Sequence, residues 1–466
     1  MGEKIQFTAE VPIVHETDVL VLGAGPAGLC AALAAARNGA KTILIEQAGF
    51  AGGMATAGLV SPFMTSYSKS SGLMIIRGLF EEIILRLEAK GGVIHPDKIK
   101  APSAYTSWIS VGHDHVAPFD AEQFKLVADE MLKDAGVTVL YHTSFVKGIS
   151  KEKRVEMIII NSKNGLEAIK AVSFIDCSGD GDLAADSGAA FEIGDEKNKV
   201  MQPATLFFRI GNVDSKKVEA DITANIHSFR RENGINYRSF HWRVSEARNA
   251  GDWNLERTSI GLFKGVADGE WSVNTSRIMG IDGTRAESLS TGEMEGRRQV
   301  DEIFRFIKKY IPGCENAVLL STASTIGIRE TRHIRGEYLL SADDLLNCII
   351  PDDVILLASN SIDVHGRFGP LSNDYKTIDG QYYGLPFRSL IPQGFKNLLI
   401  AGRCISATSE AAGALRLMPV CMGTGQAVGT AAALMLKKSN TEKPDFSLLD
   451  INELKELLKR QNVFLP

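Results

Sequence analysis

Apolar runs bounded by glycine open the chain and predict a strand, a helix and a second strand in quick succession. DVLVLG (18–23) is rich in valine and leucine, which is typical of a strand buried on both faces of a parallel sheet. The small residues of 29–39 then predict a helix that ends at Gly39. KTILIE (41–46) predicts a second buried strand, and it ends in an acid.

Periodic patterns continue along the next hundred or so residues. Residues 71–90 repeat apolar side chains at helical spacing and predict a helix. Asp120 is placed to cap a further helix that ends at Gly136. We expect a strand over 137–149, and two antiparallel strands on either side of the turn Lys163-Asn164-Gly165.

The last part of the chain returns to short buried strands. FIDCSGD (174–180) and NLLIAGR (397–403) each predict a strand that ends in a glycine turn. Small residues from Gly423 predict the start of an apolar helix. Residues 191–394 between them are long, mixed and rich in tryptophan and arginine, and they contain no second strand-bound G-x-G-x-x-G motif.

These patterns predict an α/β fold: a Rossmann-like nucleotide-binding domain, with a parallel sheet and an antiparallel meander, and an inserted mixed α+β substrate domain. The expected division is 1–65, first part of the binding domain; 66–119, substrate or cap region; 120–190, second part; 191–394, inserted substrate domain; 395–440, third part; and 441–466, C-terminal helical tail.

Composition excludes several classes of partner. The chain has 466 residues, a net charge of −5 and no basic block, so we expect no nucleic-acid partner. Its apolar runs look too short and too interrupted by glycine to span a membrane, and no signal peptide precedes the first strand, so we expect a cytoplasmic protein. None of the six cysteines forms a C-x-x-C pair, and no metal site is expected.

The turn GAGPAG (23–28) carries the first candidate chemistry. Gly23 permits a tight turn, Gly25 lets a pyrophosphate approach the backbone, and Gly28 lets helix and strand pack closely. Glu46 follows at the end of the second strand, where an acid binds a ribose and disfavours the 2′-phosphate of NADP. The glycine-rich loop 49–60 comes next and is suited to close approach to the same ligand.

In combination these motifs resemble the FAD-dependent oxidoreductase family, within the glutathione-reductase-like flavoproteins whose poorly characterised members are often labelled xanthan-lyase-associated. The resemblance runs from about Thr17 to about Lys438 and also rests on MQPATLFFRI (201–210) and GIRETRHIRGEYLL (327–340). It implies FAD as the cofactor.

The resemblance also implies contacts for individual residues. Residues 23–28 would meet the pyrophosphate, Glu46 the adenosine ribose and the Val146 backbone the adenine. The helix beginning near Gly425 would direct its N-terminus at the flavin. The residues that we expect to bind FAD are Gly23, Gly25, Pro26, Ala27, Gly28, Glu46, Gln47, Gly53, Met54, Val146, Gly179, Asp180, Gly402, Arg403, Gly425 and Gln426.

Arg403 departs from the pattern of the disulfide reductases, which have Gly-Asp where this chain has Gly-Arg (402–403). A guanidinium cannot accept a hydrogen bond from a ribityl hydroxyl, so the contact made by that Asp is not expected here. An alternative contact is with the pyrophosphate oxygens.

Three side chains are candidates for acid–base or substrate contacts: His115, His365 and Arg416. The histidines could instead be ordinary loop residues, with His113 and His115 at a surface turn, and Arg416 could form a structural pair with Glu410.

Two further features have a functional and a structural interpretation. The charged segment 329–332 suits either a substrate anion site or, slightly better, a solvated helix face. Cys421 stands where a helix N-terminus would lower a thiol pKa, although a buried packing role is favoured.

The sequence therefore predicts an FAD-dependent enzyme that transfers hydride between flavin N5 and a small polar substrate, with an unidentified electron acceptor or donor. One alternative is an electron-transfer subunit with a partner protein. Others are a reductase or hydroxylase that uses NAD(P)H, and a flavoprotein without redox chemistry. A homo-oligomer is possible.

Overall fold

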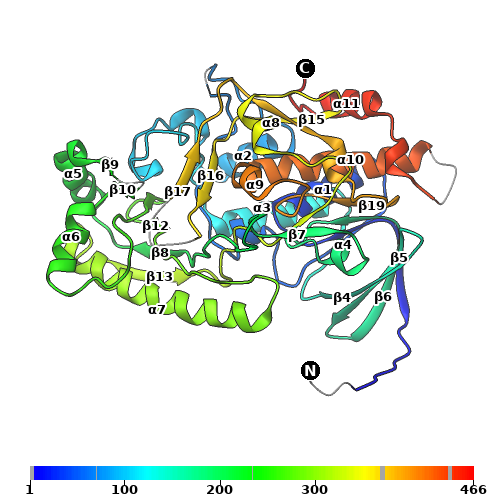
Figure 1. The fold of residues 1–466 in the computed structure, drawn as a ribbon, viewed down its shortest axis with the longest axis horizontal. Helices are drawn as coiled ribbons and strands as arrows, with labels where there is room; N and C mark the ends of the chain where they lie inside the picture. Colours follow the sequence, from blue (N-terminus) through cyan, green and yellow to red (C-terminus); the bar gives the residue numbers. More distant parts are fainter. Residues whose placement is uncertain (1–4, 70, 233–234, 368–372, 439–442) are drawn as a thin grey trace.

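The computed structural model describes residues 5–69, 71–232, 235–367, 373–438 and 443–466. Its main sheet has seven strands, in the order β3-β2-β1-β6-β5-β4, with β19 also paired to β6 (Figure 1). These strands are β1 (Ile13–Leu22), β2 (Thr42–Ile45), β3 (Thr138–Leu140), β4 (Ser144–Lys151), β5 (Arg154–Ser162), β6 (Gly165–Asp176) and β19 (Leu398–Ile400). The α/β fold with a parallel-rich Rossmann-like sheet is as predicted from the sequence, except that the strand expected over 137–149 is divided into β3 and β4.

Strand β6 joins the parallel sheet to the antiparallel meander. Its first half pairs antiparallel with β5, with Met157 opposite Lys170, and the turn 163–165 connects the two as predicted. Its second half pairs parallel with β19, with Leu398 opposite Phe174. Since β1 runs parallel to β6 along both halves, the carboxyl ends of β1, β6 and β19 meet at one edge.

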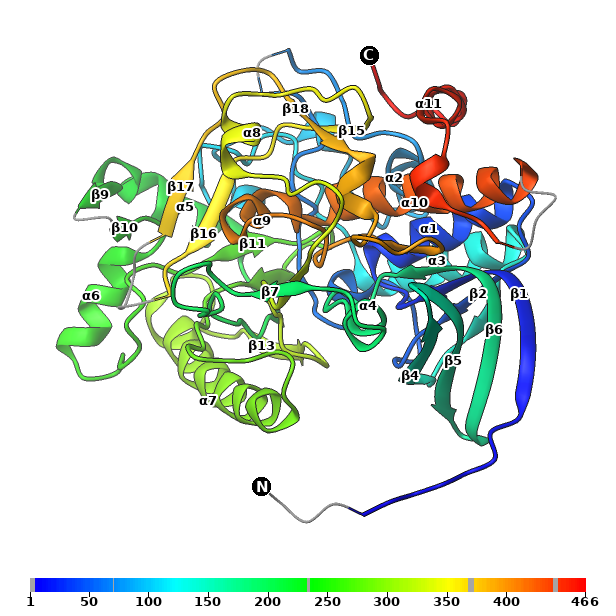
Figure 2. The same ribbon diagram turned by 45° about the vertical axis from the view of Figure 1, so that its right-hand side comes forward.

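Three helices cover one face of this sheet: α1 (Pro26–Arg37), α3 (Ala121–Asp134) and α10 (Met418–Lys438) (Figure 2). Asp120 caps α3 as expected, accepting from the backbone of Glu122 and Gln123. Helix α10 begins at Met418 rather than near Gly423, because the apolar residues before the glycines continue the helix.

Helices α1 and α10 cross at very short distance. A Cβ on Gly425 would lie 2.0 Å from the Ala27 carbonyl oxygen, and one on Gly429 would lie 2.1 Å from that of Ala31. Small residues spaced four apart on both helices therefore permit this packing. Helix α10 is also long and apolar enough to cross a membrane over Met418–Lys437, contrary to the sequence expectation, yet 89% of that window is buried inside the protein, as in a core helix.

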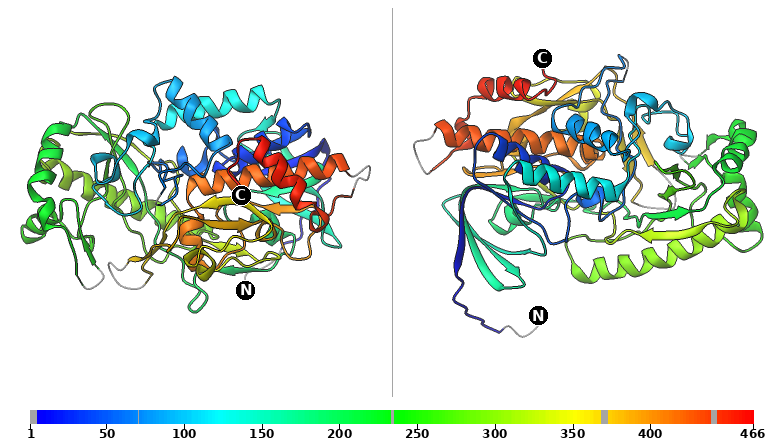
Figure 3. Two further views of the ribbon diagram at one scale, coloured as in Figure 1. Left: turned by 90° about the horizontal axis from the view of Figure 1, so that it is seen from above. Right: turned by 180° about the vertical axis from the view of Figure 1, so that it is seen from behind.

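A second core lies around the antiparallel sheet β11-β12-β8-β13, with Trp271 and Phe306 fully buried. The long helix α7 (Ala286–Tyr310) runs along this part (Figure 3). The strands and shorter helices of this second part are β8 (Phe208–Gly211), α5 (Ser215–Asn225), β9 (Arg230–Glu232), β10 (Ile235–Tyr237), α6 (His241–Asn249), β11 (Leu262–Lys264), β12 (Trp271–Val273) and β13 (Val318–Thr322).

Later strands return to the first core. Strands β15 (Val354–Ala358) and β18 (Tyr383–Pro386) pair with each other and bury their side chains there. Strands β16 (Ile362–His365) and β17 (Asn373–Lys376) lie between the two parts (Figures 1 and 2). The remaining elements are α2 (Leu79–Ala89), α4 (Asp182–Asp186), β7 (Phe191–Ile193), β14 (Arg332–Ile334), α8 (Ala342–Leu346), α9 (Ser409–Leu415) and α11 (Ile451–Arg460). The domain boundaries stay a prediction.

Candidate functional site

The glycine turn after β1 leaves an open space at one position. Gly23 has φ +88° and Gly28 lies so close to it that a Cβ there would be 1.7 Å from the Gly23 carbonyl oxygen. Gly25 differs, because its φ is −65° and a Cβ would meet no atom within 4 Å. Gly23 and Gly28 are therefore needed by the turn itself, whereas no contact within the described part of the chain requires glycine at Gly25.

Glu46 fixes the turn from the next strand. Its carboxylate accepts hydrogen bonds from the backbone N–H of Ala24 (2.8 Å) and of Ala48 (2.9 Å). Two further lone pairs on these oxygens remain for another donor.

Two cavities meet at this edge of the sheet. The smaller, about 590 Å³, is bounded by Glu46, residues 143–145 and Arg332. The larger, about 810 Å³, runs from the glycine turn to β16 and the start of α10. Glu46, Gln47 and Asp180 line both. The predicted cofactor residues that line the larger cavity are Gly23, Gly25, Pro26, Ala27, Glu46, Gln47, Gly53, Met54, Gly179, Asp180, Gly402 and Arg403.

Four predicted cofactor residues lie elsewhere. Gly28 packs beneath the turn. Val146 is 45% exposed and lies one residue past the segment 143–145 that lines the smaller cavity. Gly425 and Gln426 are inside α10, two turns from its start, so the helix N-terminus is not at these residues. Gln426 instead accepts from the Leu79 backbone (2.8 Å).

Arg403 and Asp180 are paired with each other. The Arg403 guanidinium donates to the Asp180 carboxylate at 2.8 Å, and Thr331 donates to the same oxygen at 2.6 Å. The Arg403 Nη1 is buried with no partner in the described part of the chain. Gly179 has φ +82° and packs against this guanidinium. The pair ties the turn after β6 to the turn after β19.

Two of the three predicted catalytic residues reach the far end of the larger cavity. His365, at the end of β16, contacts Asp363, with 3.3 Å between His365 Nε2 and Asp363 Oδ2. Arg416 follows α9 and donates to the Asp363 carbonyl oxygen at 3.0 Å. The alternative pair of Arg416 with Glu410 is not formed, because Glu410 binds Lys376.

His115 does not line the cavity. Its ring stacks on Tyr67, with ring centroids 4.2 Å apart, and its Nδ1 lies 3.2 Å from the Pro96 carbonyl oxygen. The neighbouring His113 does line the cavity. The loop therefore turns one histidine inward and the next toward Tyr67, a difference that loop composition does not encode.

Charge around His365 opposes its protonation. Burial and the Arg329 guanidinium lower the pKa of His365 to about 3, against the attraction of Asp363. Burial by itself would raise the pKa of Asp363, but His365, Arg416 and Arg329 outweigh it and hold that pKa well below its usual range. At neutral pH the site therefore contains a neutral imidazole beside a carboxylate.

This lowered pKa predicts an acid-sensitive contribution to stability. Below pH 6.5 the unfolded chain protonates His365 while the folded chain does so near pH 3, so the free energy of unfolding should fall by about 1 kcal/mol per pH unit across this window. His365→Gln should remove that loss. Urea unfolding at pH 7, 6 and 5 measures it, with the exposed His227→Gln as control. Parallel curves for wild type and His365→Gln would contradict it.

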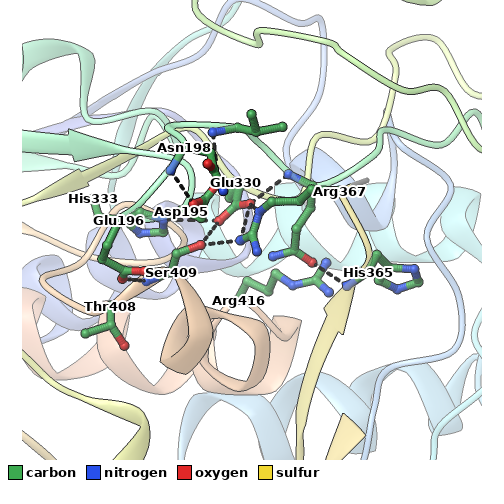
Figure 4. A network of polar contacts seen from close by, with 12 residues as sticks. Asp195, Glu196, Asn198, Glu330, His333, His365, Arg367, Thr408, Ser409 and Arg416 are labelled. Atoms are coloured by element: carbon green, nitrogen blue, oxygen red, sulfur yellow. Dashed lines mark hydrogen bonds and ion pairs between the residues drawn. The ribbon is translucent and has the colours of Figure 1, made fainter. Parts of the chain in front are cut away.

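A network of polar contacts around Glu330 connects the segments that carry His365 and Arg416 (Figure 4). Glu330 is fully buried, and its carboxylate accepts from Arg367 (2.7 Å) and from the backbone of Gln202 (2.7 Å). The Gln202 side chain in turn accepts from the His365 backbone at 3.0 Å, and Ser409 at the start of α9 donates to Glu330. Glu330 thus links the two elements that carry His365 and Arg416.

The expectation of a solvated helix over 329–332 is wrong. The segment is not helical, and Glu330 and Thr331 are fully buried. Burial would raise the pKa of Glu330, but His333 and the Arg367 guanidinium outweigh it and lower the pKa to about 2. The density of charges in the segment was the available signal, but it cannot distinguish buried partners from solvent.

Cys421 lines the cavity wall near the start of α10 but is not activated. Burial raises the pKa of its thiol to about 12, more than Arg403 and Arg416 lower it. At neutral pH the thiol is protonated, so the packing interpretation is favoured.

Comparisons with known proteins place the chain among flavoproteins. A family model described as FAD dependent oxidoreductase matches residues 18–458. No curated protein matches. One similar solved structure is a geranylgeranyl bacteriochlorophyll reductase-like protein from Thermoplasma acidophilum, at 14% identity and TM-score 0.46, covering 96% of this chain and 84% of that one.

Two further solved structures show comparable similarity. The p-nitrophenol 4-monooxygenase PnpA from Pseudomonas putida has 12% identity and a TM-score of 0.45, with 97% of this chain and 86% of that one covered. An L-amino acid deaminase from Proteus myxofaciens in complex with anthranilate has 11% identity and a TM-score of 0.45, with 96% and 95% covered.

Proposed function

Because the chain belongs to the family of FAD-dependent oxidoreductases, we propose that it transfers a hydride between its cofactor, FAD, and a small polar substrate bound in the larger cavity. FAD supplies a two-electron centre at flavin N5 that exchanges hydride with a substrate carbon. The observation that carries the proposal is a single cavity lined both by Gly25 of the glycine turn and by His365 and Arg416.

The residues at the glycine turn fit FAD. Gly25 lines the cavity, and a Cβ at this position would project into open space. The missing side chain therefore leaves room for a ligand. Helix α1 begins there with no side-chain cap and no acid in its first turn. Its first backbone N–H groups therefore remain available to a pyrophosphate.

The adenosine end fits the smaller cavity. Glu46 has lone pairs beyond those that bind Ala24 and Ala48, which supports its proposed contact with the ribose hydroxyls. Residues 143–145 bound the same cavity and replace Val146 in the proposed adenine contact. Arg403 is held by Asp180, and its buried Nη1 would donate to the cofactor's phosphate or ribityl oxygens.

His365 is the proposed acid–base residue. Oxidation of a substrate releases a hydride from carbon and a proton from the attached oxygen or nitrogen; reduction takes up both. A neutral imidazole accepts that proton, and Asp363 at 3.3 Å orients the ring and stabilises its charged form. Arg416, next to Asp363, orients a polar substrate group.

An absorbance spectrum followed by anaerobic titration tests the proposal. Purified protein should show flavin bands near about 375 and 450 nm. A substrate from a panel of sugars, hydroxy acids and amines should bleach them, more slowly in His365→Gln. Bleaching by NAD(P)H alone would replace the proposal with a reductase or hydroxylase. Bleaching only by a partner protein would replace it with an electron-transfer subunit.

The finer placement rests on the sequence motifs. We place the chain in the glutathione-reductase-like group and keep the xanthan-lyase-associated label as part of the same proposal. We also propose a cytoplasmic protein that acts on a small molecule, with no nucleic-acid or membrane partner, and a homo-oligomer as its assembly.

A further inference from the structure

We propose that the substrate of this site is an organic anion, and that Arg329 and Arg416 bind its charged group. The inference rests on the proposed function, since it names the class of molecule that enters the cavity beside FAD. A carboxylate or a phosphate would supply the required charge.

The two arginines face the cavity without a carboxylate of their own. Arg329 donates to the Pro203 carbonyl oxygen, and Arg416 donates to the Asp363 carbonyl oxygen at 3.0 Å. Both acceptors are neutral. Within the described residues neither guanidinium forms an ion pair, and both line the larger cavity. The Asp363 carboxylate attracts both guanidinium groups through space, but among the described residues it forms an ion pair with neither of them.

Three other arginines near the site each form an ion pair with a carboxylate. Arg332 pairs with Asp182 (2.8 Å), Arg367 with Glu330 (2.7 Å) and Arg403 with Asp180 (2.8 Å). The chain therefore supplies a carboxylate to each of these three arginines but not to Arg329 or Arg416.

Positive charge at this end of the cavity is electrostatically unfavourable. Burial lowers the pKa of both Arg329 and Arg416, and Arg257 and Arg277 add further like charge close to Arg329. Guanidinium groups stay charged despite such shifts. A bound anion would relieve the repulsion and form charge-assisted hydrogen bonds, which Arg makes with carboxylate and phosphate in two-pronged geometry.

The same geometry predicts an effect on His365. Arg329 and Arg416 both oppose protonation of its ring. An anion bound to them would cancel part of their field, so the pKa of His365 should rise when the cavity is filled.

Calorimetric titration of the FAD-loaded protein with benzoate, phenyl phosphate and benzamide tests the inference. Benzamide has nearly the shape of benzoate without its charge. Benzoate or phenyl phosphate should bind at least about 10-fold more tightly than benzamide. Equal affinities, or benzamide as the tightest ligand, would overturn the proposal, and this comparison needs no variant.

Variants then assign the binding to the two arginines. Arg329→Gln and Arg416→Gln should each weaken the anion at least about 10-fold and leave benzamide within about 2-fold. The control is Arg305→Gln, which removes an arginine that is 72% exposed on α7. Anion affinity that survives both substitutions would overturn the assignment.

Histidine NMR separates this inference from the proposed redox function. Benzoate should raise the pKa of His365 in the wild type and not in Arg416→Gln, whether or not any substrate bleaches the flavin. Tight anion binding without redox turnover would contradict the proposed function and support the anion site. Redox turnover of neutral compounds alone would do the reverse.

Discussion

Gly25→Ala should weaken FAD binding by about 100-fold while leaving the folded protein almost as stable as the wild type. The methyl group would enter open space, because among the described residues no atom beyond the adjacent two residues lies within 4 Å of the Cβ position, and φ is −65°. It would occupy the space that we assign to the pyrophosphate, where a loss of about 2.7 kcal/mol corresponds to 100-fold. Fluorescence titration of the apoprotein with FAD measures it.

The matched control is Gly28→Ala in the same turn. Its methyl carbon would lie 1.7 Å from the Gly23 carbonyl oxygen, so this variant should lose stability in the absence of FAD. Gly25→Ala should show the opposite combination, with a normal urea midpoint and weak FAD binding. Wild-type FAD affinity in Gly25→Ala would show that the pyrophosphate binds elsewhere.

Glu330→Gln should destabilise the protein by about 3 kcal/mol. The substitution removes the buried charge that Arg367 contacts at 2.7 Å and leaves that largely covered arginine, 13% exposed, without its carboxylate partner. Breaking a buried pair from one side typically costs about 3–5 kcal/mol. Urea unfolding of both proteins at pH 7 measures the loss.

The pH dependence identifies the cause. The pKa of Glu330 is lowered to about 2 in the folded protein, so its stabilising effect is complete above the ordinary carboxyl range and is lost as pH falls toward 2. The difference between wild type and Glu330→Gln should shrink over that range. Glu82→Gln, which breaks a pair with Arg37 in which both side chains are about a third exposed, should cost no more than about 1 kcal/mol. Equal losses in the two variants would rule out the buried-pair explanation.

Local patterns were sufficient wherever a few neighbouring residues determine the structure. The unit from 18 to 46, the cap at Asp120 and the turn at 163–165 follow from apolar runs, a capping side chain and turn-forming residues. The family follows from the same motifs, and the match over residues 18–458 confirms it.

The start of helix α10 was not predicted correctly from local sequence. Glycines 423 and 425 suggested a helix start, although they are internal. Glycine at 425 is required by the close approach of α1, at 2.0 Å from a Cβ to the Ala27 carbonyl oxygen. A glycine that serves packing against a distant helix looks in sequence like one that begins a helix.

The sequence by itself determined the parallel sheet and the glycine turn at its edge, because the residues involved are close along the chain and their spacing reflects backbone geometry. Tertiary structure alone decided which charged side chains pair with each other around the site. Glu330 and Arg367 are 37 residues apart, and Arg403 and Asp180 are 223 apart, so no local pattern pairs them. It also decided that Arg329 and Arg416 reach one cavity and have no ion-pair partner among the described residues, because a residue's partners are set by the elements that converge on it and not by its neighbours in sequence.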